Sequence, residues 1–330
     1  MFDLAALPLA RVPLLAGPTD IAAIGPDTWV KREDRAGTRY GGNKVRKLEW
    51  LLGAALEVGG DVLTIGTVGS NHLVATAVYG QASGAEVHAV VAPQPDTPTA
   101  RVNARILHAH AEKLWVAAAE VAVPLAWAKA RVALRVFGGY PPTVIPIGGS
   151  NPLGCVGWVG GGLEIAAQVA AGALPPPDRV YVPLGSGGTA AGLLVGLRLA
   201  GLESEVVAVR AAPSWLASPL RVRRLAANTL ALLRRHGAPA TKLGGLRIVD
   251  GFYGAGYARS TPATEAAASR AADLGLTLER TYTAKAFAAM EAEPGGRRLF
   301  VHTANTHPLE PLLETALDEV PASLTGLFRR

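Results

Sequence analysis

Short apolar runs rich in β-branched residues alternate along this chain with longer stretches in which alanine and leucine recur at helical spacing. The short runs are bounded by turn residues and predict strands, and the longer stretches predict the helices that follow them. This alternation is typical of an α/β fold with mostly parallel sheets. The predicted strands are residues 28–30, 61–66, 86–91, 143–147, 179–184, 205–210, 246–249 and 299–302.

Capping residues mark where several helices begin. Ser70 precedes apolar positions that share one helix face, and Thr97 precedes Pro98 at another predicted helix start. Further helices are predicted over residues 190–199 and along the arginine-rich, amphipathic residues 221–235. The chain shows no internal repeat and no low-complexity linker, so composition does not mark domain boundaries.

A glycine turn directly precedes a predicted helix that begins near Lys44. Gly41 and Gly42 permit tight or left-handed backbone, and apolar residues follow Lys44 at helical spacing. Burial and the positive end of a helix dipole would both lower the pKa of such a lysine. A partly neutral lysine is what Schiff-base chemistry requires. The alternative is a solvated cation at a helix start, which the spacing alone favours.

A second glycine turn, residues 185–189 (Gly185, Ser186, Gly187, Gly188 and Thr189), lies between a predicted strand and a predicted helix. Backbone N–H groups and the helix dipole can bind a phosphate there, although a tight structural connection is about as plausible. The turn lacks the Gly-Lys-Ser/Thr ending of a P-loop and is not a dinucleotide fingerprint. A bound phosphate would therefore belong to another small molecule.

Three polar side chains, Ser70, Asn71 and His72, follow directly after a predicted buried strand. Ligands of open α/β sheets usually bind at such a strand end, whereas the alternative is an ordinary capped helix. Tyr257 and Tyr282 are further candidates, for which core packing is the default. No serine-hydrolase elbow is present, and the seven histidines show no zinc spacing, so we expect no metal site.

Composition narrows the class of protein. The chain has 330 residues, 49% of them hydrophobic, which suffices for two domains or one large one. The single cysteine, Cys155, excludes an internal disulfide framework, and the first residues do not resemble a secretion signal, so we expect a cytoplasmic protein. The net charge of +6 comes mostly from scattered arginines, and the one dense arginine patch, within residues 221–235, has no interleaved aromatics for stacking, which disfavours nucleic-acid binding.

An uncharged run of 18 residues, 180–197, reaches the lower length limit of a membrane span. Pro183 and the glycines that follow favour a strand, a loop and a helix instead. We therefore expect no membrane association.

Taken together, these segments resemble the fold type II pyridoxal-phosphate enzymes that comprise D-cysteine desulfhydrases and 1-aminocyclopropane-1-carboxylate deaminases. The resemblance runs almost end to end. It rests on residues 31–34 (KRED), 41–49 (GGNKVRKLE), 70–72 (SNH), 148–154 (GGSNPLG), 185–189 (GSGGT), 282–283 (YT) and 302–303 (HT).

The resemblance implies a tryptophan synthase beta-like fold with two three-layer α/β/α domains. A large cofactor domain would comprise residues 1–51 and 161–330, with a small inserted domain at residues 52–160 and the substrate between them. Lys44 would bind pyridoxal 5'-phosphate as a Schiff base, Asn71 its phenolic oxygen, and residues 185–189 with Lys47 its phosphate. Thr303 would face the pyridine nitrogen. A homodimer is usual in this family.

The resemblance also implies a reaction at the α-carbon of an amino-acid substrate, whose carbanion the cofactor stabilises. Lys44 would move the α-proton. Ser70 and Tyr282 would orient the carboxylate or handle protons, and His72 and Tyr257 would help to bind the substrate. With a thiol leaving group, β-elimination gives pyruvate, ammonia and sulfide. The Tyr282-Thr283 pair is the desulfhydrase pattern, whereas the deaminases carry Tyr-Glu, and this favours a D-amino acid such as D-cysteine.

Four positions depart from the family pattern. Gly69 stands where glutamine is usual, Val74 where arginine is usual, and Ala304 and Asn305 where two glycines are expected. These departures keep three alternatives open: a 1-aminocyclopropane-1-carboxylate deaminase, a related lyase of altered specificity, and a cofactor-binding protein without catalysis.

Overall fold

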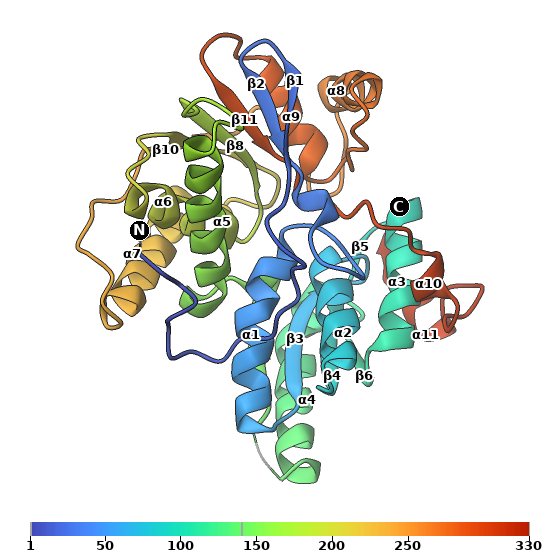
Figure 1. Cartoon of the computed structure of the whole chain (residues 1–330). Coiled ribbons are helices and arrows are strands. Elements are labelled where there is room, and N and C mark those ends of the chain that lie inside the picture. Colours follow the sequence, from blue (N-terminus) through green and yellow to red (C-terminus); the bar gives the residue numbers. More distant parts are fainter. Residues whose placement is uncertain (1, 140, 330) are drawn as a thin grey trace. The chain divides into compact units, whose positions relative to one another are not determined.

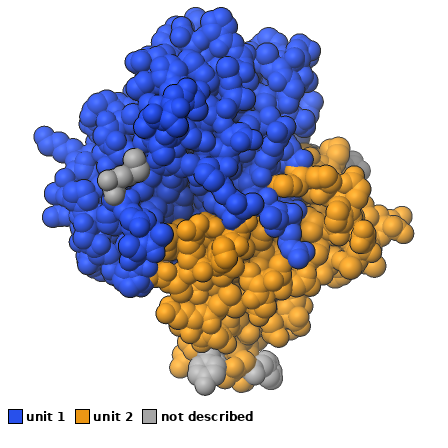
Figure 2. Space-filling model, viewed as in Figure 1, with its two compact units in different colours: residues 1–8, 15–47, 150–306 blue, residues 9–14, 48–149, 307–330 orange. Residues whose placement is uncertain are grey.

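The computed structural model describes residues 2–139 and 141–329, and the chain divides into two compact units (Figure 2). Unit 1 comprises the first eight residues, residues 15–47 and residues 150–306, and unit 2 comprises residues 9–14, 48–149 and 307–330. The chain passes from unit 1 to unit 2 between residues 47 and 48 and returns to unit 1 between residues 149 and 150. The assignment of residues 52–160 to an inserted domain stays a prediction.

Unit 1 is built on a six-stranded sheet in the order β1-β2-β11-β8-β9-β10 (Figure 1). Strand β1 pairs with β2 in antiparallel fashion and the other pairings are parallel. Phe300 of β11 pairs with Val30 of β2 on one side and with Tyr181 of β8 on the other. The strands are β1 (Ile21–Gly25), β2 (Thr28–Lys31), β8 (Arg179–Leu184), β9 (Glu205–Arg210), β10 (Leu246–Val249) and β11 (Arg298–Val301).

Helices cover both faces of this sheet. Alternate strand residues such as Tyr181, Val207 and Phe300 join a core cluster with α8 (Pro262–Asp273) and α9 (Thr283–Glu291). The other face is covered by α6 (Gly188–Leu199), which contacts β8 and β9 and packs on α5 (Pro152–Ala170) and α7 (Pro219–Arg234). Because successive strand residues point to opposite faces, both sets are buried, and unit 1 has three layers.

Unit 2 contains a four-stranded parallel sheet in the order β6-β4-β3-β7. Helix α4 packs its buried alanines and Leu134 on Leu63 and Val90 of this sheet. A two-stranded sheet pairs β5 with β12. The elements are β3 (Val62–Thr67), α2 (Asn71–Ala82), β4 (Val87–Ala92), β5 (Gln94–Pro95), α3 (Pro98–His110), β6 (Lys113–Val116), α4 (Val123–Phe137), β7 (Thr143–Ile145), α10 (Glu310–Leu313), α11 (Ala322–Thr325) and β12 (Phe328–Arg329). Helix α1 (Lys44–Val58) begins in unit 1, and three 3-10 turns occupy Glu33–Arg35, Glu120–Ala122 and Ile147–Gly149.

All eight predicted strands form; β8, β9 and β10 have the predicted bounds, and the ends of the other five differ by one or two residues. Strand β7 ends at Ile145, because Pro146 has no N–H to donate and a 3-10 turn follows. Helix α6 begins at Gly188, two residues earlier than predicted, because Gly187 takes a left-handed conformation and serves as its N-cap. The pattern missed β1, β5, β6 and β12. Strand β1 (IAAIG) is alanine-rich and only partly buried, and its pairing with β2 is a tertiary contact that periodicity does not reveal.

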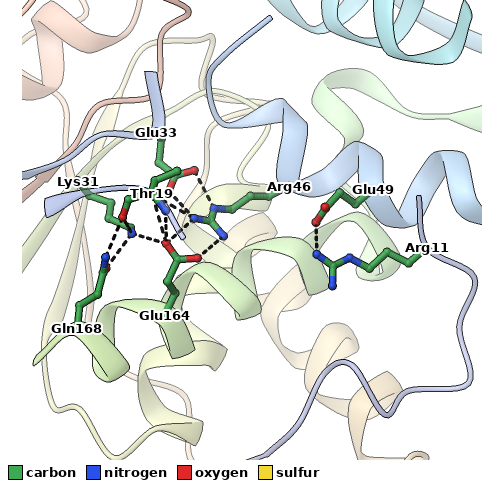
Figure 3. A network of polar contacts seen from close by, with 8 residues as sticks. All are labelled: Arg11, Thr19, Lys31, Glu33, Arg46, Glu49, Glu164 and Gln168. Carbon is green, nitrogen blue, oxygen red and sulfur yellow. Dashed lines mark hydrogen bonds and ion pairs between the residues drawn. The ribbon is translucent and has the colours of Figure 1, made fainter. Parts of the chain in front are cut away.

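A buried ionic network ties α1 to the 3-10 turn and to α5 within unit 1 (Figure 3). The Arg46 guanidinium donates to both carboxylate oxygens of Glu33 at 2.7 Å and to those of Glu164 at 2.9 and 3.0 Å. Lys31 pairs with Glu164, and the Thr19 hydroxyl donates to Glu33 at 2.6 Å. Two cations thus balance two carboxylates, and every pair is satisfied as burial demands.

The run of residues 180–197 is a strand, a turn and a helix, as predicted. A different helix, α5, is long and apolar enough to cross a membrane by length and composition. About 61% of its apolar window is buried within the structure, as in the core helix of a folded domain.

Candidate active site

The glycine turn before Lys44 is held by the segment that follows β11. Gly42 has φ +92°, and a Cβ on it would lie 2.6 Å from the Thr303 carbonyl oxygen, so only glycine fits. The Gly41 N–H donates to Asn305 Oδ1 at 2.5 Å. Helix α1 begins at Lys44, as the periodicity predicted. The local sequence therefore fixes the backbone that presents this lysine.

Lys44 is partly buried, and its ammonium group donates to Asn43 Oδ1 at 2.7 Å. Burial and, to a smaller extent, the charge of Lys47 lower the pKa of Lys44 to about 7, against the opposing effect of the Glu279 carboxylate. About half of the Lys44 side chains are then neutral near pH 7. The expectation of a solvated cation does not describe these surroundings, whereas a nucleophilic amine does.

The second glycine turn forms a cradle of donors. Gly187 has φ +88° and caps α6 without a capping side chain. The Gly188 N–H donates to Ser150 Oγ at 3.1 Å, the buried Lys47 ammonium donates to the same oxygen at 3.2 Å, and the hydroxyls of Ser150 and Ser186 lie 2.7 Å apart. Burial lowers the pKa of Lys47 to about 8, so a nearby anion would stabilise its charged form.

One hydrogen-bond relay joins the two glycine turns. Asn43 accepts from Lys44 through Oδ1 and donates through Nδ2 to Thr189 Oγ1 at 2.9 Å. The Trp158 indole N–H holds the Asn43 carbonyl at 2.9 Å. The structure therefore brings Lys44 and the 185–189 turn together within unit 1.

Tyr282 lies against the same turn. A Cβ on Gly185 would come within 3.2 Å of the Tyr282 ring, and the Tyr282 hydroxyl donates to the Tyr257 hydroxyl at 3.0 Å. Burial, reinforced by Tyr257, raises the pKa of Tyr282 well above its usual value. Tyr282 therefore keeps its proton at neutral pH and can donate it.

Glu279 fixes the backbone at Tyr282. Its carboxylate accepts from the N–H groups of Thr281, Tyr282 and Thr283 at 2.7 to 2.8 Å, at the start of α9. Thr283 is fully buried, and its hydroxyl donates to the Glu279 carbonyl at 3.0 Å. Thr283 thus closes the 279–283 turn.

The polar turn Ser70-Asn71-His72 belongs to unit 2. Ser70 caps α2 by accepting from the N–H groups of His72 and Leu73. His72 is buried and its ring nitrogens lie 2.9 Å from Thr64 Oγ1 and 3.4 Å from Thr76 Oγ1. The Asn71 side chain accepts from Asn103 at 2.7 Å. The substrate and cofactor roles of these three residues stay predictions.

The four departures from the family pattern have physical reasons in the structure. A Cβ on Gly69 would lie 2.5 Å from the Ala100 Cβ, so no glutamine fits without rearrangement. Val74 is fully buried in unit 2, where an arginine would be desolvated, and Ala304 is buried beside Gly42. Asn305 accepts a hydrogen bond from the Gly41 N–H and so helps to hold the glycine turn before Lys44.

Sequence reasoning left four contributing residues out of the site. Asn43 and Ser150 lie inside the segments 41–49 and 148–154, which carry the family resemblance, and membership of these segments was the available signal. Asn305 was marked only as a departure from the family pattern, and its contact with the Gly41 N–H is a long-range one that the sequence does not show. Glu279 accepts from the backbone N–H groups of the turn that follows it, and no pattern in the sequence marks it.

Comparisons with known proteins identify the family to which this chain belongs. Residues 5–304 match the family described as pyridoxal-phosphate dependent enzyme. The chain is 37% identical over 315 residues to the nocardicin C-9' epimerase of Nocardia uniformis subsp. tsuyamanensis, covering 90% of this chain and 93% of that protein. It is 31% identical over 326 residues to a D-cysteine desulfhydrase of Klebsiella pneumoniae (strain 342), covering 91% and 95%.

A putative 1-aminocyclopropane-1-carboxylate deaminase of Pyrococcus abyssi is 33% identical over 294 residues, which cover 85% of this chain and 84% of that protein. Among solved structures, one described as an ACC deaminase homologue superposes with a TM-score of 0.77 at 27% identity. That match covers 93% of this chain and 97% of the other.

Proposed function

The chain belongs to the pyridoxal-phosphate dependent enzyme family, and we propose that Lys44 is the residue that binds this cofactor covalently. The expected fold type II architecture and the expected cofactor are confirmed by the family match and the structural neighbours. The observation that carries the proposal is a partly buried lysine of pKa about 7, joined through Asn43 to a glycine turn built to hold an anion.

The residues of unit 1 fit the cofactor's chemical groups. The backbone of residues 185–189, the Lys47 ammonium and the Ser150 hydroxyl would hold the phosphate, since a Cβ on Gly188 would lie 2.5 Å from Ser150 Oγ and 2.8 Å from Lys47 Nζ. Thr303, on the segment beside Gly42, would face the pyridine nitrogen, as the family resemblance implies. When bound, the cofactor withdraws electrons from the substrate α-carbon and so makes its proton acidic.

The chain's own groups supply the proton transfers. A neutral Lys44 amine can accept the proton from the substrate α-carbon, and a pKa near 7 suits this task at neutral pH. The Tyr282 hydroxyl, which keeps its proton, can donate a hydrogen bond to the leaving group or to the substrate carboxylate. Tyr257 orients that hydroxyl from 3.0 Å away.

We propose β-elimination from D-cysteine or a related β-substituted amino acid. The Cα–H and Cβ–S bonds break, the proton passes to Lys44, sulfide leaves, and addition of one water yields pyruvate and ammonia. The relatives named D-cysteine desulfhydrase support this substrate, as does threonine at position 283. Deamination of 1-aminocyclopropane-1-carboxylate is the alternative within the same family.

A second candidate is epimerisation at an amino-acid α-carbon. It is favoured by 37% identity to a nocardicin C-9' epimerase over 90% of this chain. Epimerisation also begins with removal of the α-proton but returns a proton to the other face. Lys44 and Tyr282 are the two groups of unit 1 that would serve as acid and base.

One assay separates these reactions. Protein reconstituted with pyridoxal phosphate is supplied with D-cysteine, L-cysteine and 1-aminocyclopropane-1-carboxylate, and pyruvate, 2-oxobutanoate and sulfide are measured. The enantiomers of an amino acid without a β-leaving group are incubated in D₂O in parallel, with Lys44→Ala as control. We expect pyruvate and sulfide from D-cysteine. Turnover of the cyclopropane acid alone, or loss of optical purity without elimination, would overturn the proposed reaction in favour of the corresponding alternative.

The assembly and location of the protein are further proposals from the family resemblance. We propose a cytoplasmic homodimer that acts on a free amino acid and binds neither nucleic acid nor membranes. Sedimentation equilibrium should give twice the chain mass of 34.1 kDa, and a monomer at micromolar concentration would contradict the dimer.

A further inference from the structure

Three ligating side chains gather at the amino ends of two neighbouring strands of unit 2. Asp61 directly precedes β3, Glu86 directly precedes β4, and His88 is the second residue of β4. Glu86 and His88 are two residues apart on an extended backbone, so they share a face of the sheet. The ligand atoms of the three residues all lie within 4.8 Å of one another.

The His88 side chain has an unusual environment. Residue His88 is only 5% exposed, and neither ring nitrogen forms a hydrogen bond with any other residue in the described part of the chain. Its Nε2 points toward Asp61 Oδ2 at 3.7 Å, which is too long for a hydrogen bond. Buried polar groups normally have a hydrogen-bond partner or a bound ion, so the ring nitrogens of His88 are suited to bind a ligand.

We propose that Asp61, Glu86 and His88 bind a divalent transition-metal cation, with Zn²⁺ the best match to one imidazole and two carboxylates. A zinc ion about 2.1 Å from both atoms would span the 3.7 Å between Nε2 and Oδ2 at an angle of about 120°. Three protein ligands leave a fourth position for water. Small rotations of the exposed Glu86 side chain would bring its oxygen into the same sphere.

The surrounding charges favour a cation. The carboxylate of Glu112 also lies near His88. The charged groups close to His88 are therefore three carboxylates and only one ammonium group, that of Lys113. The carboxyl end of α4 approaches as well, because a Cβ on its C-cap residue Gly138 would lie 3.0 Å from Asp61 Oδ2. A helix C-terminus carries partial negative charge, which attracts cations.

The position of the site indicates a structural role. All three ligands belong to unit 2, whereas Lys44, Lys47, Tyr282 and the 185–189 turn belong to unit 1. A bound ion would clamp the starts of β3 and β4, which pair directly in the four-stranded sheet. The sequence analysis expected no metal, because ligands from two strands 25 residues apart produce no recognisable spacing.

The test uses the full-length protein loaded with pyridoxal phosphate, freed of metals by chelation and titrated with ZnCl₂ in a calorimeter. We expect one equivalent to bind with a dissociation constant in the micromolar range or below. Zinc should also raise the melting temperature by about 2 °C or more, because the ligand binds the folded state. MgCl₂ should do neither at the same concentration, because an imidazole ligand disfavours magnesium.

Variants of the three proposed ligands test whether the zinc ion binds at this site. Glu86→Gln changes an exposed side chain, so the fold should persist while zinc affinity falls at least tenfold, and Asp61→Asn and His88→Gln should abolish binding. Glu120→Gln, at another exposed carboxylate of unit 2, should bind zinc like the parent protein. Absence of zinc binding by the parent protein, or equal affinity in parent and Glu86→Gln, would overturn the proposal.

Discussion

Exposure separates Lys44 from the other lysines of unit 1 whose pKa is lowered, which are Lys31, Lys47 and Lys285. Lys47 is 2% exposed and Lys285 is fully buried, and they donate to Ser150 Oγ and to the Tyr253 carbonyl respectively. Lys44 is partly exposed, so a cofactor aldehyde can reach its amine. Burial lowers the pKa of Lys285 only to about 8, against about 7 for Lys44. Both accessibility and protonation therefore favour Lys44 as the nucleophile.

The pKa of Lys44 predicts how cofactor uptake depends on pH. Only the neutral amine attacks an aldehyde, so the uptake rate of the cofactor-free protein should rise about tenfold between pH 5.5 and 6.5 and level off above about pH 8. Stopped-flow absorbance with pyridoxal, which has no titrating phosphate, would measure this. A rate that keeps rising to pH 10 would show that the amine has the pKa of an ordinary lysine.

At the scale of elements, the start of α6 depends on the absence of a side chain at Gly188. A Cβ there would lie 2.5 Å from Ser150 Oγ and 2.8 Å from Lys47 Nζ, inside the proposed phosphate cradle. Gly188→Ala should therefore weaken cofactor affinity by about tenfold or more while the protein stays folded. Fluorescence titration with pyridoxal phosphate measures the affinity.

Gly251→Ala is the matched control, because nothing lies within 4 Å of a Cβ at that position. Its affinity for the cofactor should equal that of the parent protein. Unchanged affinity in Gly188→Ala as well would show that the space beside Gly188, Ser150 and Lys47 does not hold the cofactor phosphate.

The ionic network around Arg46 should matter for stability rather than for chemistry. Replacing Arg46 with Met leaves the carboxylates of Glu33 and Glu164 buried without their main cation, which should cost about 3–5 kcal/mol of unfolding free energy. Urea denaturation measures the loss. The exposed pair of Arg280 and Glu265 provides the comparison, and Arg280→Met should cost less than about 1 kcal/mol. Similar losses in both variants would contradict this reading of the network.

At the scale of the whole molecule, the sequence predicted local features well and long-range ones poorly. Strands such as β8 and β9 were recognisable because they are short runs of buried, mostly apolar residues that contain several valines, and Lys44 because a glycine turn and a helical period meet there. The sequence pattern did not predict strand β1, because this strand is defined by its pairing with β2 and not by its own residues. Local spacing also could not show that Asn305 binds the Gly41 turn, or that Asp61 and His88 meet.

In the candidate site, too, the sequence predicted the local segments but not the long-range contacts between them. Order along the chain identified the 185–189 turn, Lys47 and Tyr282, and the structure connects them in unit 1 through Asn43, Ser150 and the Tyr282 ring. The pKa of Lys44 could be anticipated only in direction, because its value depends on how deeply the folded chain buries the amine. The opposing charge of Glu279, 235 residues further along the chain, was not foreseeable.

The central claim is that Lys44 holds the cofactor. Reconstituted protein is reduced with sodium borohydride, digested and analysed by mass spectrometry, since reduction makes the bond between lysine and cofactor permanent. We predict one phosphopyridoxyl group per chain, on the peptide that contains Lys44, and none in Lys44→Ala. A label on Lys285 or Lys47 in the parent protein would contradict the account.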